Sequence, residues 1–173
     1  GIALPEAQAV RLPDRVTFDH GACMGIPGLT AMHAVRLVGE IGGKTILVTG
    51  AASSVGHYVT QMAKLRGARV IGTASAERQA HAREAGADFV IDYKSKDVAT
   101  VVKDLTRGAG VHGIIDMDVS STVRLVADGI MSAHGRHIVY GSNATGDIPV
   151  PFSQMLRGSL AMQFMLVYEL TAA

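Results

Sequence analysis

The residues with the clearest chemical potential form the turn GAASSVG, residues 50–56, which directly follows the apolar run TILVT. Gly50 and Gly56 allow a tight backbone turn, and Ser53 offers a hydroxyl that can cap a helix. A turn between a strand and a helix leaves backbone N–H groups free, and the positive end of the helix dipole attracts phosphate. The dinucleotide-binding fingerprint also has glycine at the middle place, where this chain has Ser53 followed by Ser54. By itself the stretch is either a phosphate-binding turn or a plain strand–helix turn.

A second polar group lies about twenty residues further along, at the end of the next apolar run. NAD-specific sites of this kind place Asp or Glu there, to hold the ribose hydroxyls. This chain instead has Thr73, Ala74 and Ser75, with Glu77 and Arg78 shortly after. Small hydroxyl residues and a guanidinium suit a 2′-phosphate, so the pattern favours NADP over NAD. The alternative is that Arg78 is an ordinary solvated charge on the following helix.

These polar groups need a scaffold, and the spacing of the apolar runs predicts one. Runs that are apolar almost throughout are typical of strands buried on both faces of a parallel sheet, and here each precedes a turn and an amphipathic stretch. The alternation predicts an α/β fold of the Rossmann type, a doubly wound parallel sheet with helices on both faces. The predicted strands are Thr45–Thr49, Arg69–Thr73, Phe89–Asp92, Val111–Asp116, Arg136–Tyr140 and Ala161–Val167. The predicted helices span residues 55–66, 76–85, 96–107 and 120–131.

Composition excludes several classes of protein. The chain has 173 residues, 48% of them hydrophobic and 18% charged, as expected for one folded domain rather than a disordered segment. Its net charge of +1, with acidic and basic residues interspersed, gives no footprint for nucleic acid or an anionic membrane. The apolar stretch 160–168 is too short to span a membrane, and no secretory signal opens the chain. A single cysteine, Cys23, suits a reducing cytoplasm.

Residues 1–22 do not fit the alternation of strands and helices. The turn-rich LPDRVTFDHG ends this segment, which we expect to be the remnant of another domain or a linker. Residues 23–173 would then form the dinucleotide-binding domain, as part of a longer protein.

Taken together, these segments resemble a known family. They are similar to the nucleotide-binding portion of the zinc-independent quinone oxidoreductases, a branch of the medium-chain dehydrogenase/reductase (alcohol dehydrogenase-like) superfamily. The resemblance includes GIPGLTAMHAV at 25–35, GKTILVTGAASSVGHYVTQMAK at 43–64 and GARVIGTASAERQAHAREAGADFVIDY at 67–93. It continues through GRHIVYGSN at 135–143 and PVPFSQMLRGSLAMQFMLVYELT at 149–171. It implies a two-domain oxidoreductase that passes a hydride from NADPH to a quinone or another activated α,β-unsaturated carbonyl. A zinc-free alcohol dehydrogenase or an enoyl reductase of the same superfamily is the alternative.

The resemblance also implies roles for individual residues toward NADP(H). The turn would hold the pyrophosphate through Gly50, Ala52, Ser53, Ser54, Val55 and Gly56, although the family commonly has Gly-Gly where Ser53 and Ser54 stand. The 2′-phosphate and adenine side would be contacted by Ser75, Arg78 and Tyr93, of which Tyr93 is alternatively a core-edge aromatic. The nicotinamide side would be formed by Thr30, Gly141, Ser142 and the backbone of Phe164, Met165 and Leu166 in a buried strand. No residue has a convincing acid–base role, so the catalytic residues are unknown.

No metal site is expected. Zinc-dependent relatives have a cysteine ligand where this chain has Ile26, and Cys23 further upstream is expected to be a small buried residue. His134 and His137 have the spacing of helical metal ligands, but Gly135 and the following strand break the helix that such a pair needs.

The sequence argues against two other classes of protein. A short-chain dehydrogenase would need a Tyr-x-x-x-Lys pair, and none of the four tyrosines has a lysine four residues later. A dinucleotide-sensing regulatory module would use the same fold, but the family-like segments 1–35 and 149–171 argue against it. By resemblance, the partners are a small-molecule substrate and a second copy of the chain, paired through the last strand.

Overall fold

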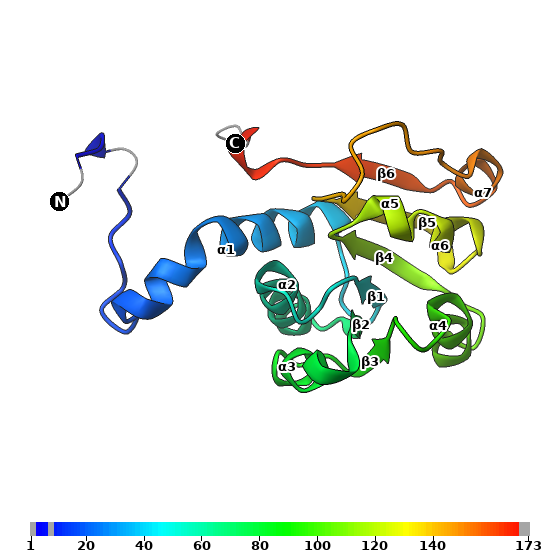
Figure 1. Ribbon diagram of the computed structural model, residues 1–173, viewed down its shortest axis with the longest axis horizontal. Helices are drawn as coiled ribbons and strands as arrows, with labels where there is room; N and C mark the ends of the chain where they lie inside the picture. The colour runs from blue at the N-terminus through cyan, green and yellow to red at the C-terminus, as the bar shows by residue number, and fades with distance from the viewer. Residues whose placement is uncertain (1–2, 7–8, 170–173) are drawn as a thin grey trace.

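The structure, a computed structural model, describes residues 3–6 and 9–169. Within them, six strands form one sheet in the order β3-β2-β1-β4-β5-β6, and every neighbouring pair is parallel (Figure 1). The chain builds β1 to β3 outward in one direction, then returns to the centre and builds β4 to β6 in the other, so the order reverses between β1 and β4. The strands are β1 (Thr45–Val48), β2 (Arg69–Ala74), β3 (Phe89–Asp92), β4 (Val111–Asp116), β5 (Met131–Val139) and β6 (Ala161–Phe164).

Helices cover both faces of the sheet. One face carries α1 (Phe18–Val38), α2 (Ser54–Leu65) and α3 (Gln79–Glu84), with the 3₁₀ turn η2 (Ala76–Arg78) leading into α3. The other carries α4 (Val98–Thr106), α5 (Val119–Thr122), α6 (Arg124–Ala127) and α7 (Phe152–Arg157). A second 3₁₀ turn, η3 (Val167–Glu169), follows β6. The doubly wound parallel α/β fold predicted from the apolar runs is confirmed.

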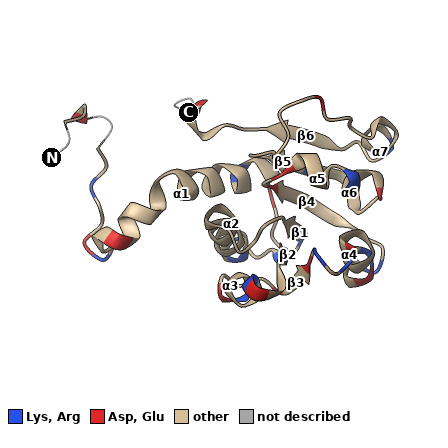
Figure 2. Ribbon diagram, in the orientation of Figure 1, with Lys and Arg blue, Asp and Glu red and all other residues tan. Residues whose placement is uncertain are grey.

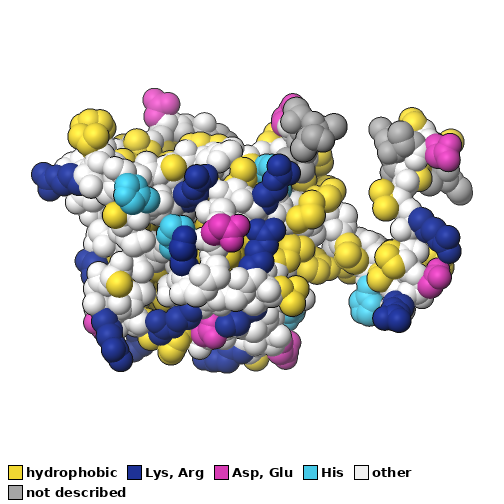
Figure 3. All heavy atoms as spheres, turned by 180° about the vertical axis from the view of Figure 1, so that it is seen from behind, with side chains coloured by type: hydrophobic (Ala, Val, Ile, Leu, Met, Phe, Trp, Pro, Cys, Tyr) yellow, Lys and Arg dark blue, Asp and Glu magenta, His cyan; other side chains and the backbone are white. Residues whose placement is uncertain are grey.

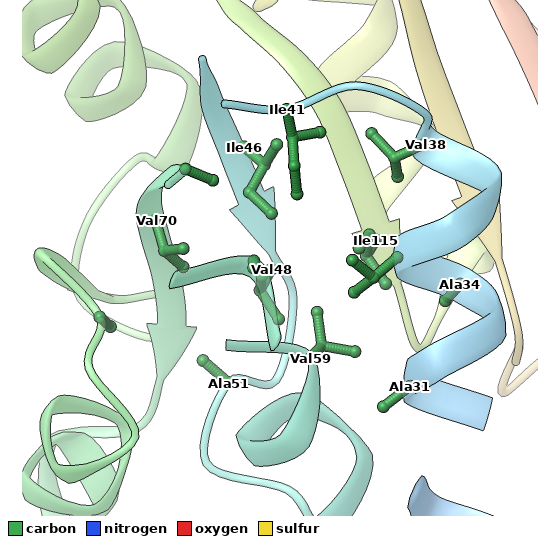
Figure 4. Close-up of a cluster of buried hydrophobic side chains, with 14 of the residues drawn as sticks. Ala31, Ala34, Val38, Ile41, Ile46, Val48, Ala51, Val59, Val70 and Ile115 are labelled. Carbon is green, nitrogen blue, oxygen red and sulfur yellow. The ribbon is translucent and has the colours of Figure 1, made fainter. Parts of the chain in front are cut away.

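Each face has its own hydrophobic core. Alternate residues of a strand point to opposite faces, so in β1 Ile46 and Val48 pack under α1 and α2, whereas Leu47 packs under α4. Figure 4 shows the first core, where Val59 of α2 and Ala34 of α1 face the sheet. The apolar face of α2 packs onto this core through Val55, Val59, Met62 and Ala63.

Apart from Asp116, the charged side chains of the described residues lie outside the buried interior. Both basic and acidic residues lie on α3 and α4, as the interspersed charges of the sequence predict (Figure 2). No helix in the described part of the chain is both long and apolar enough to cross a membrane.

The strands β1 to β4 agree with the prediction to within one residue, whereas β5 and β6 differ from it. β3 and β4 have the predicted bounds, and β1 and β2 differ from them by one residue. β5 begins at Met131 rather than Arg136 and ends at Val139, before Tyr140. β6 ends at Phe164 rather than Val167, because the chain turns into η3 and Glu169 N donates to Leu166 O at 3.0 Å.

The predicted helix over 120–131 is wrong. Two short helices, α5 and α6, stand in its place. Hydroxyl side chains here lie against Asp118 rather than leaving the backbone to continue regularly: Ser121 Oγ donates to Asp118 Oδ2 at 2.7 Å, and Thr122 Oγ1 lies 2.8 Å from Asp118 O. Gly129, with φ 72°, then ends the helical segment. α7 lies between β5 and β6, where no helix is predicted.

Helix α1 is the largest element that the sequence analysis missed. It runs from Phe18 across the expected boundary between residues 22 and 23. Its internal Pro27 has no N–H, which leaves the carbonyl oxygen of Cys23 without its helical donor. Tyr58 OH donates to that oxygen at 3.4 Å, so α2 supplies the missing bond.

Only the second half of α1 packs on the sheet. Its buried residues are Thr30, Ala31, Ala34, Val35 and Val38. The first half extends beyond the sheet, and hydrophobic side chains gather where the helix leaves the body (Figures 1 and 3). Cys23 lies in this first half and is exposed, which corrects the expectation that it is buried.

Candidate functional site

The turn between β1 and α2 depends on both of its glycines. Gly50 has φ 61°, in the left-handed region, and a Cβ there would collide with Met117 Sδ. A Cβ on Gly56 would overlap Gly50 O and lie 2.9 Å from Ala51 Cα. Ser53 caps α2 as expected, because its Oγ accepts from Gly56 N at 3.1 Å.

The same turn presents unused hydrogen-bond donors. Within the described residues, the N–H groups of Ala52, Ser54 and Val55 donate to no protein acceptor, whereas Ser53 N is bonded to Gly50 O at 2.8 Å. The three free groups lie at the start of a 12-residue helix, where the dipole adds positive potential. They fit the oxygens of a pyrophosphate, since the small side chains leave the backbone accessible to an anion.

Thr73 fixes this turn against the end of β2. Gly50 N donates to Thr73 Oγ1 at 3.0 Å, and Ala51 N donates to Thr73 O at 2.9 Å. In the sequence, Thr73 is one of the small hydroxyl residues that favour a 2′-phosphate. Its hydroxyl instead holds the two strand ends together, so that the turn and the β2 terminus form one surface.

The end of β2 carries a mixture of charges. Ser75 is half-buried, and Arg78 is exposed on η2. A hydrogen bond from the Ser75 side chain lowers the pKa of Glu77, and the positive charge of Lys94 contributes to the shift. Lys94 follows β3, and sequence reasoning overlooked it. Its position beside Glu77 adds a second cation to the place where Arg78 was expected to face a 2′-phosphate.

A cleft of about 310 Å³ opens at the carboxyl edge of the sheet, beside the point where the strand order reverses. Open α/β sheets bind ligands at such points. Two of the predicted site residues, Gly50 and Tyr93, line this cleft. Its other lining residues were not among the predicted site residues. Tyr93 is 52% exposed and lines the cleft. The added lining residues are Thr49, Thr73, Val98, Met117, Asp118, Ser121, Thr122, Arg124, Leu125 and Asn143.

Asp118 joins two loops at the rim of this cleft. Desolvation would raise its pKa, but hydrogen bonds from Ser120, Asn143 and Ser121 outweigh it and lower the pKa to about 2. Asn143 N and Nδ2 each donate to the carboxylate at 2.8 Å. The loops after β4 and β5 are therefore tied together by an ionised carboxylate.

Gly141 and Ser142 lie in the second of these loops. A Cβ on Gly141 would collide with Met117 O, and Val119 N donates to Gly141 O at 3.1 Å. The exposed Ser142 donates its hydroxyl hydrogen to Ala144 O at 2.8 Å. Close packing explains the glycine, and Ser142 remains a residue whose predicted contact with the nicotinamide is untested.

The remaining predicted residues lie away from the cleft. Thr30 is buried in α1, and its hydroxyl donates to Ile26 O at 2.7 Å. Met165 N donates to Val139 O at 2.9 Å, which continues the pairing of β6 with β5. Phe164 and Leu166 are 65% and 56% exposed, so this segment is an open sheet edge rather than the buried strand expected. Their backbone contacts with a nicotinamide stay a prediction.

A buried polar cluster beneath the cleft was missed entirely. Asp116 Oδ1 accepts from Thr49 Oγ1 at 2.7 Å and from Asp118 N at 3.0 Å. Asp116 Oδ2 accepts from His137 Nε2 at 2.8 Å and from Thr122 Oγ1. Desolvation would raise the pKa of Asp116, but the hydrogen bond and charge of His137 lead the contributions that lower it. An acid and a histidine inside predicted buried strands were the available signals, because buried polar groups require partners.

The residues do not fit a zinc site. Ile26 has no atom that can bind a metal, and it is 51% exposed. Within residues 3–6 and 9–169, no group of three or more His, Cys, Asp and Glu could hold an ion. Of the two histidines weighed as ligands, His137 bonds to Asp116 and His134 is exposed with φ 61°.

Known proteins share this sequence and fold. The chain matches the zinc-binding dehydrogenase family over residues 54–172. A quinone oxidoreductase of Pseudomonas aeruginosa is 35% identical over 147 residues, covering 84% of this chain and 45% of that protein. A 2-haloacrylate reductase of a Burkholderia species is 30% identical over 165 residues, covering 90% of this chain and 48% of that protein.

Solved structures of the same kinds of protein also resemble this chain. A quinone oxidoreductase of Pseudomonas syringae pv. Tomato DC3000 superposes with a TM-score of 0.83 at 32% identity, covering 95% of this chain and 51% of that one. The Escherichia coli quinone oxidoreductase complexed with NADPH gives a TM-score of 0.80 at 26% identity, covering 91% and 49%. The chain spans about half the length of the curated relatives it matches.

A parallel sheet that reverses between β1 and β4, with free helix-start amides at the reversal, defines a Rossmann-type nucleotide-binding domain. The chain belongs to the zinc-binding dehydrogenase family, as the nucleotide-binding portion of a quinone oxidoreductase-like member of the medium-chain dehydrogenase/reductase superfamily.

Proposed function

We propose that this chain is the NADP(H)-binding domain of a reductase that passes a hydride from NADPH to a quinone or another activated α,β-unsaturated carbonyl. The single observation that carries the proposal is the set of three free N–H groups, on Ala52, Ser54 and Val55, at the carboxyl end of the central strand β1. A pyrophosphate supplies the acceptors that these donors lack. The NADPH complex of the Escherichia coli relative supports the choice of dinucleotide.

The nicotinamide supplies the hydride chemistry when it is bound, and this chain holds and orients it. The turn 50–56 binds the pyrophosphate. The end of β2 binds the 2′-phosphate through Ser75 and Arg78, with Lys94 as a further cation, and Tyr93 lies on the adenine side. The nicotinamide side is formed by Thr30, Gly141, Ser142, Phe164, Met165 and Leu166.

Calorimetry of the chain with NADPH and with NADH tests cofactor binding and preference. We expect NADPH to bind at least about tenfold more tightly, which corresponds to about 1.4 kcal/mol. Binding of neither cofactor would overturn the proposal. Equal affinities, or tighter binding of NADH, would overturn the preference for NADP alone.

The substrate class rests on the relatives and on the open edge of the site. Relatives named quinone oxidoreductase, 2-haloacrylate reductase and trans-enoyl reductase share the reduction of activated unsaturated compounds. In the whole protein, a second domain would hold the acceptor against the nicotinamide. Residues 1–22 would be the remnant of that domain or of a linker, and residues 23–173 the nucleotide-binding domain. Assays of NADPH oxidation by the whole protein with small quinones and enones test this. Turnover of saturated alcohols in preference to both would favour a zinc-free alcohol dehydrogenase instead.

The same proposal includes a cytoplasmic dimer formed through β6. This strand lies at the edge of the sheet, so its outer N–H and C=O groups are available to a second copy. Sedimentation equilibrium should show a dimer. Gln163→Lys, which brings two like charges together across a two-fold axis, should raise the monomer fraction; a monomeric wild type would exclude the dimer.

A further inference from the structure

A row of polar side chains crosses the centre of the sheet beneath the cleft. Thr49, Asp116 and His137 follow one another from the end of β1 through β4 to β5, and Thr122 of α5 meets Asp116 from outside the sheet. Asp116 and His137 are both 0% exposed. Burying a carboxylate and an imidazole costs free energy unless each is paired, so their place in apolar strands calls for a physical explanation.

Asp116 connects this row to the floor of the cleft. Its carboxylate accepts four hydrogen bonds, from Thr49, Asp118, Thr122 and His137. Thr49 Oγ1 in turn accepts from Met117 N at 2.9 Å. Thr49, Met117, Asp118 and Thr122 all line the cleft. One buried carboxylate therefore sets the relative positions of four lining residues from β1, the loop after β4, and α5.

His137 supplies the bond from β5. Its Nε2 lies 2.8 Å from Asp116 Oδ2, and because an ionised carboxylate only accepts, Nε2 carries the hydrogen. Its Nδ1 has no partner in the described chain, so Asp116 is the single hydrogen-bond partner of the imidazole. The histidine is thus dedicated to the carboxylate, and removing it would leave Oδ2 with the Thr122 hydroxyl alone.

We propose that Asp116 and His137 are positioning residues for the adenosine half of the bound dinucleotide. Neither side chain reaches the cleft; they act through Thr49, Met117 and Thr122. The adenosine half is indicated because the cleft extends to Thr73 and Tyr93, at the ends of β2 and β3, on the side of the turn that also carries Ser75 and Arg78. The inference rests on the proposed binding of NADP(H).

The test measures affinity for NADPH and for 2′,5′-ADP, the adenosine half alone, by calorimetry. His137→Leu should weaken both ligands by about tenfold, because the carboxylate loses its partner from β5. His137→Gln, which keeps a side-chain N–H donor, should recover most of the lost affinity. Thr49→Val removes the hydrogen bond from Thr49 to Asp116 at nearly constant side-chain volume. It should weaken the binding of both ligands although His137 is intact.

Ile130→Ala is the matched control for lost stability. Ile130 is fully buried in the core under α6, precedes β5 at the opposite end of that strand, and does not line the cleft. It should lower the unfolding temperature and leave both affinities at the wild-type value. The double variant with His137→Leu and Thr49→Val should lose less affinity than the two single losses combined, because both act on Asp116.

Wild-type affinity in His137→Leu, or in Thr49→Val where the leucine variant does not fold, would overturn the positioning role. The positioning role would also be overturned if Ile130→Ala weakened ligand binding in proportion to its loss of stability. Failure of the wild-type chain to bind NADPH would instead overturn the proposed function, so the two results are distinguishable.

Discussion

Gly56 lies directly against the backbone of Gly50: a Cβ built on Gly56 would be 2.9 Å from the carbonyl carbon of Gly50. The first turn of α2 thus packs onto the loop that leads into it. This contact sets the direction in which the free N–H groups of Ala52, Ser54 and Val55 point. The glycines at positions 50 and 56 are therefore required for this packing, whether or not a ligand is bound.

Gly56→Ala should destabilise the fold and remove tight binding of NADPH. The added methyl must displace backbone rather than a flexible side chain, so we expect a loss of about 1–3 kcal/mol in the free energy of unfolding. Urea unfolding and calorimetry measure the two effects. Gly42→Ala is the control, because a Cβ there lies 3.5 Å from Arg66 O, an ordinary contact, and the residue is far from the turn. Equal effects of the two substitutions would contradict the packing argument.

Arg78→Ala should reduce the preference for NADPH over NADH to near unity while leaving NADH affinity almost unchanged. The guanidinium is expected to contact the 2′-phosphate, which NADH lacks. Calorimetry with both cofactors gives the ratio. Arg83→Ala is the matched control, since Arg83 lies on α3 and is bonded to Gln79 Oε1 at 2.9 Å. An unchanged ratio in Arg78→Ala would assign the discrimination to Lys94 or Ser75 instead.

Asp118 should make stability depend on acid pH. Its pKa is about 2 in the folded chain, against an ordinary value of about 3.9 for an unfolded chain. A lowered pKa contributes stability above the unfolded value, and that contribution is lost as the pH falls from about 4 to about 2. Urea unfolding across this window should show a smaller pH dependence for Asp118→Asn than for wild type. Asp128→Asn, on an exposed residue after α6, should retain the wild-type slope.

The protein purified without added metal should contain no stoichiometric zinc. Ile26 stands where the resemblance places a cysteine ligand, and an aliphatic side chain cannot coordinate the ion. Elemental analysis after dialysis against a chelator decides the point. One retained equivalent of zinc would contradict the assignment to the zinc-independent branch.

The chain alone should bind NADPH yet lack useful turnover with quinones. Hydride transfer requires donor and acceptor held about 3–3.5 Å apart in a water-poor cleft. One wall of that cleft would be formed by Thr30, Ser142 and the segment around Leu166. Leu166 is 56% exposed, so this wall is open on one side. Steady-state oxidation of NADPH by the chain and by the full-length protein gives the comparison. Equal kcat/KM values would show that a second wall is not needed.

Much of the fold was predictable from local patterns. β4 has the predicted bounds because a strand buried on both faces is largely apolar, a property of consecutive residues. β3 also has the predicted bounds, although it is an edge strand and only partly buried. The turn 50–56 was predictable for a similar reason, since the glycines and Ser53 act within one short segment. Helix α1 was missed because three glycines and Pro27 interrupt its sequence. It is stabilised by contacts from elsewhere, including the hydroxyl of Tyr58 on Cys23 O.

The sequence by itself determined the alternation of strands and helices, the glycine-bearing turn 50–56 and the polar end of β2, because each depends on residues that are neighbours along the chain. Only the tertiary structure decided that Asp116, His137, Thr49 and Thr122 meet beneath the cleft. They are separated by up to 88 positions between Thr49 and His137, and parallel strands placed them side by side. A hydrogen bond between strands depends on register and on which face each side chain occupies, and neither is encoded in any single segment.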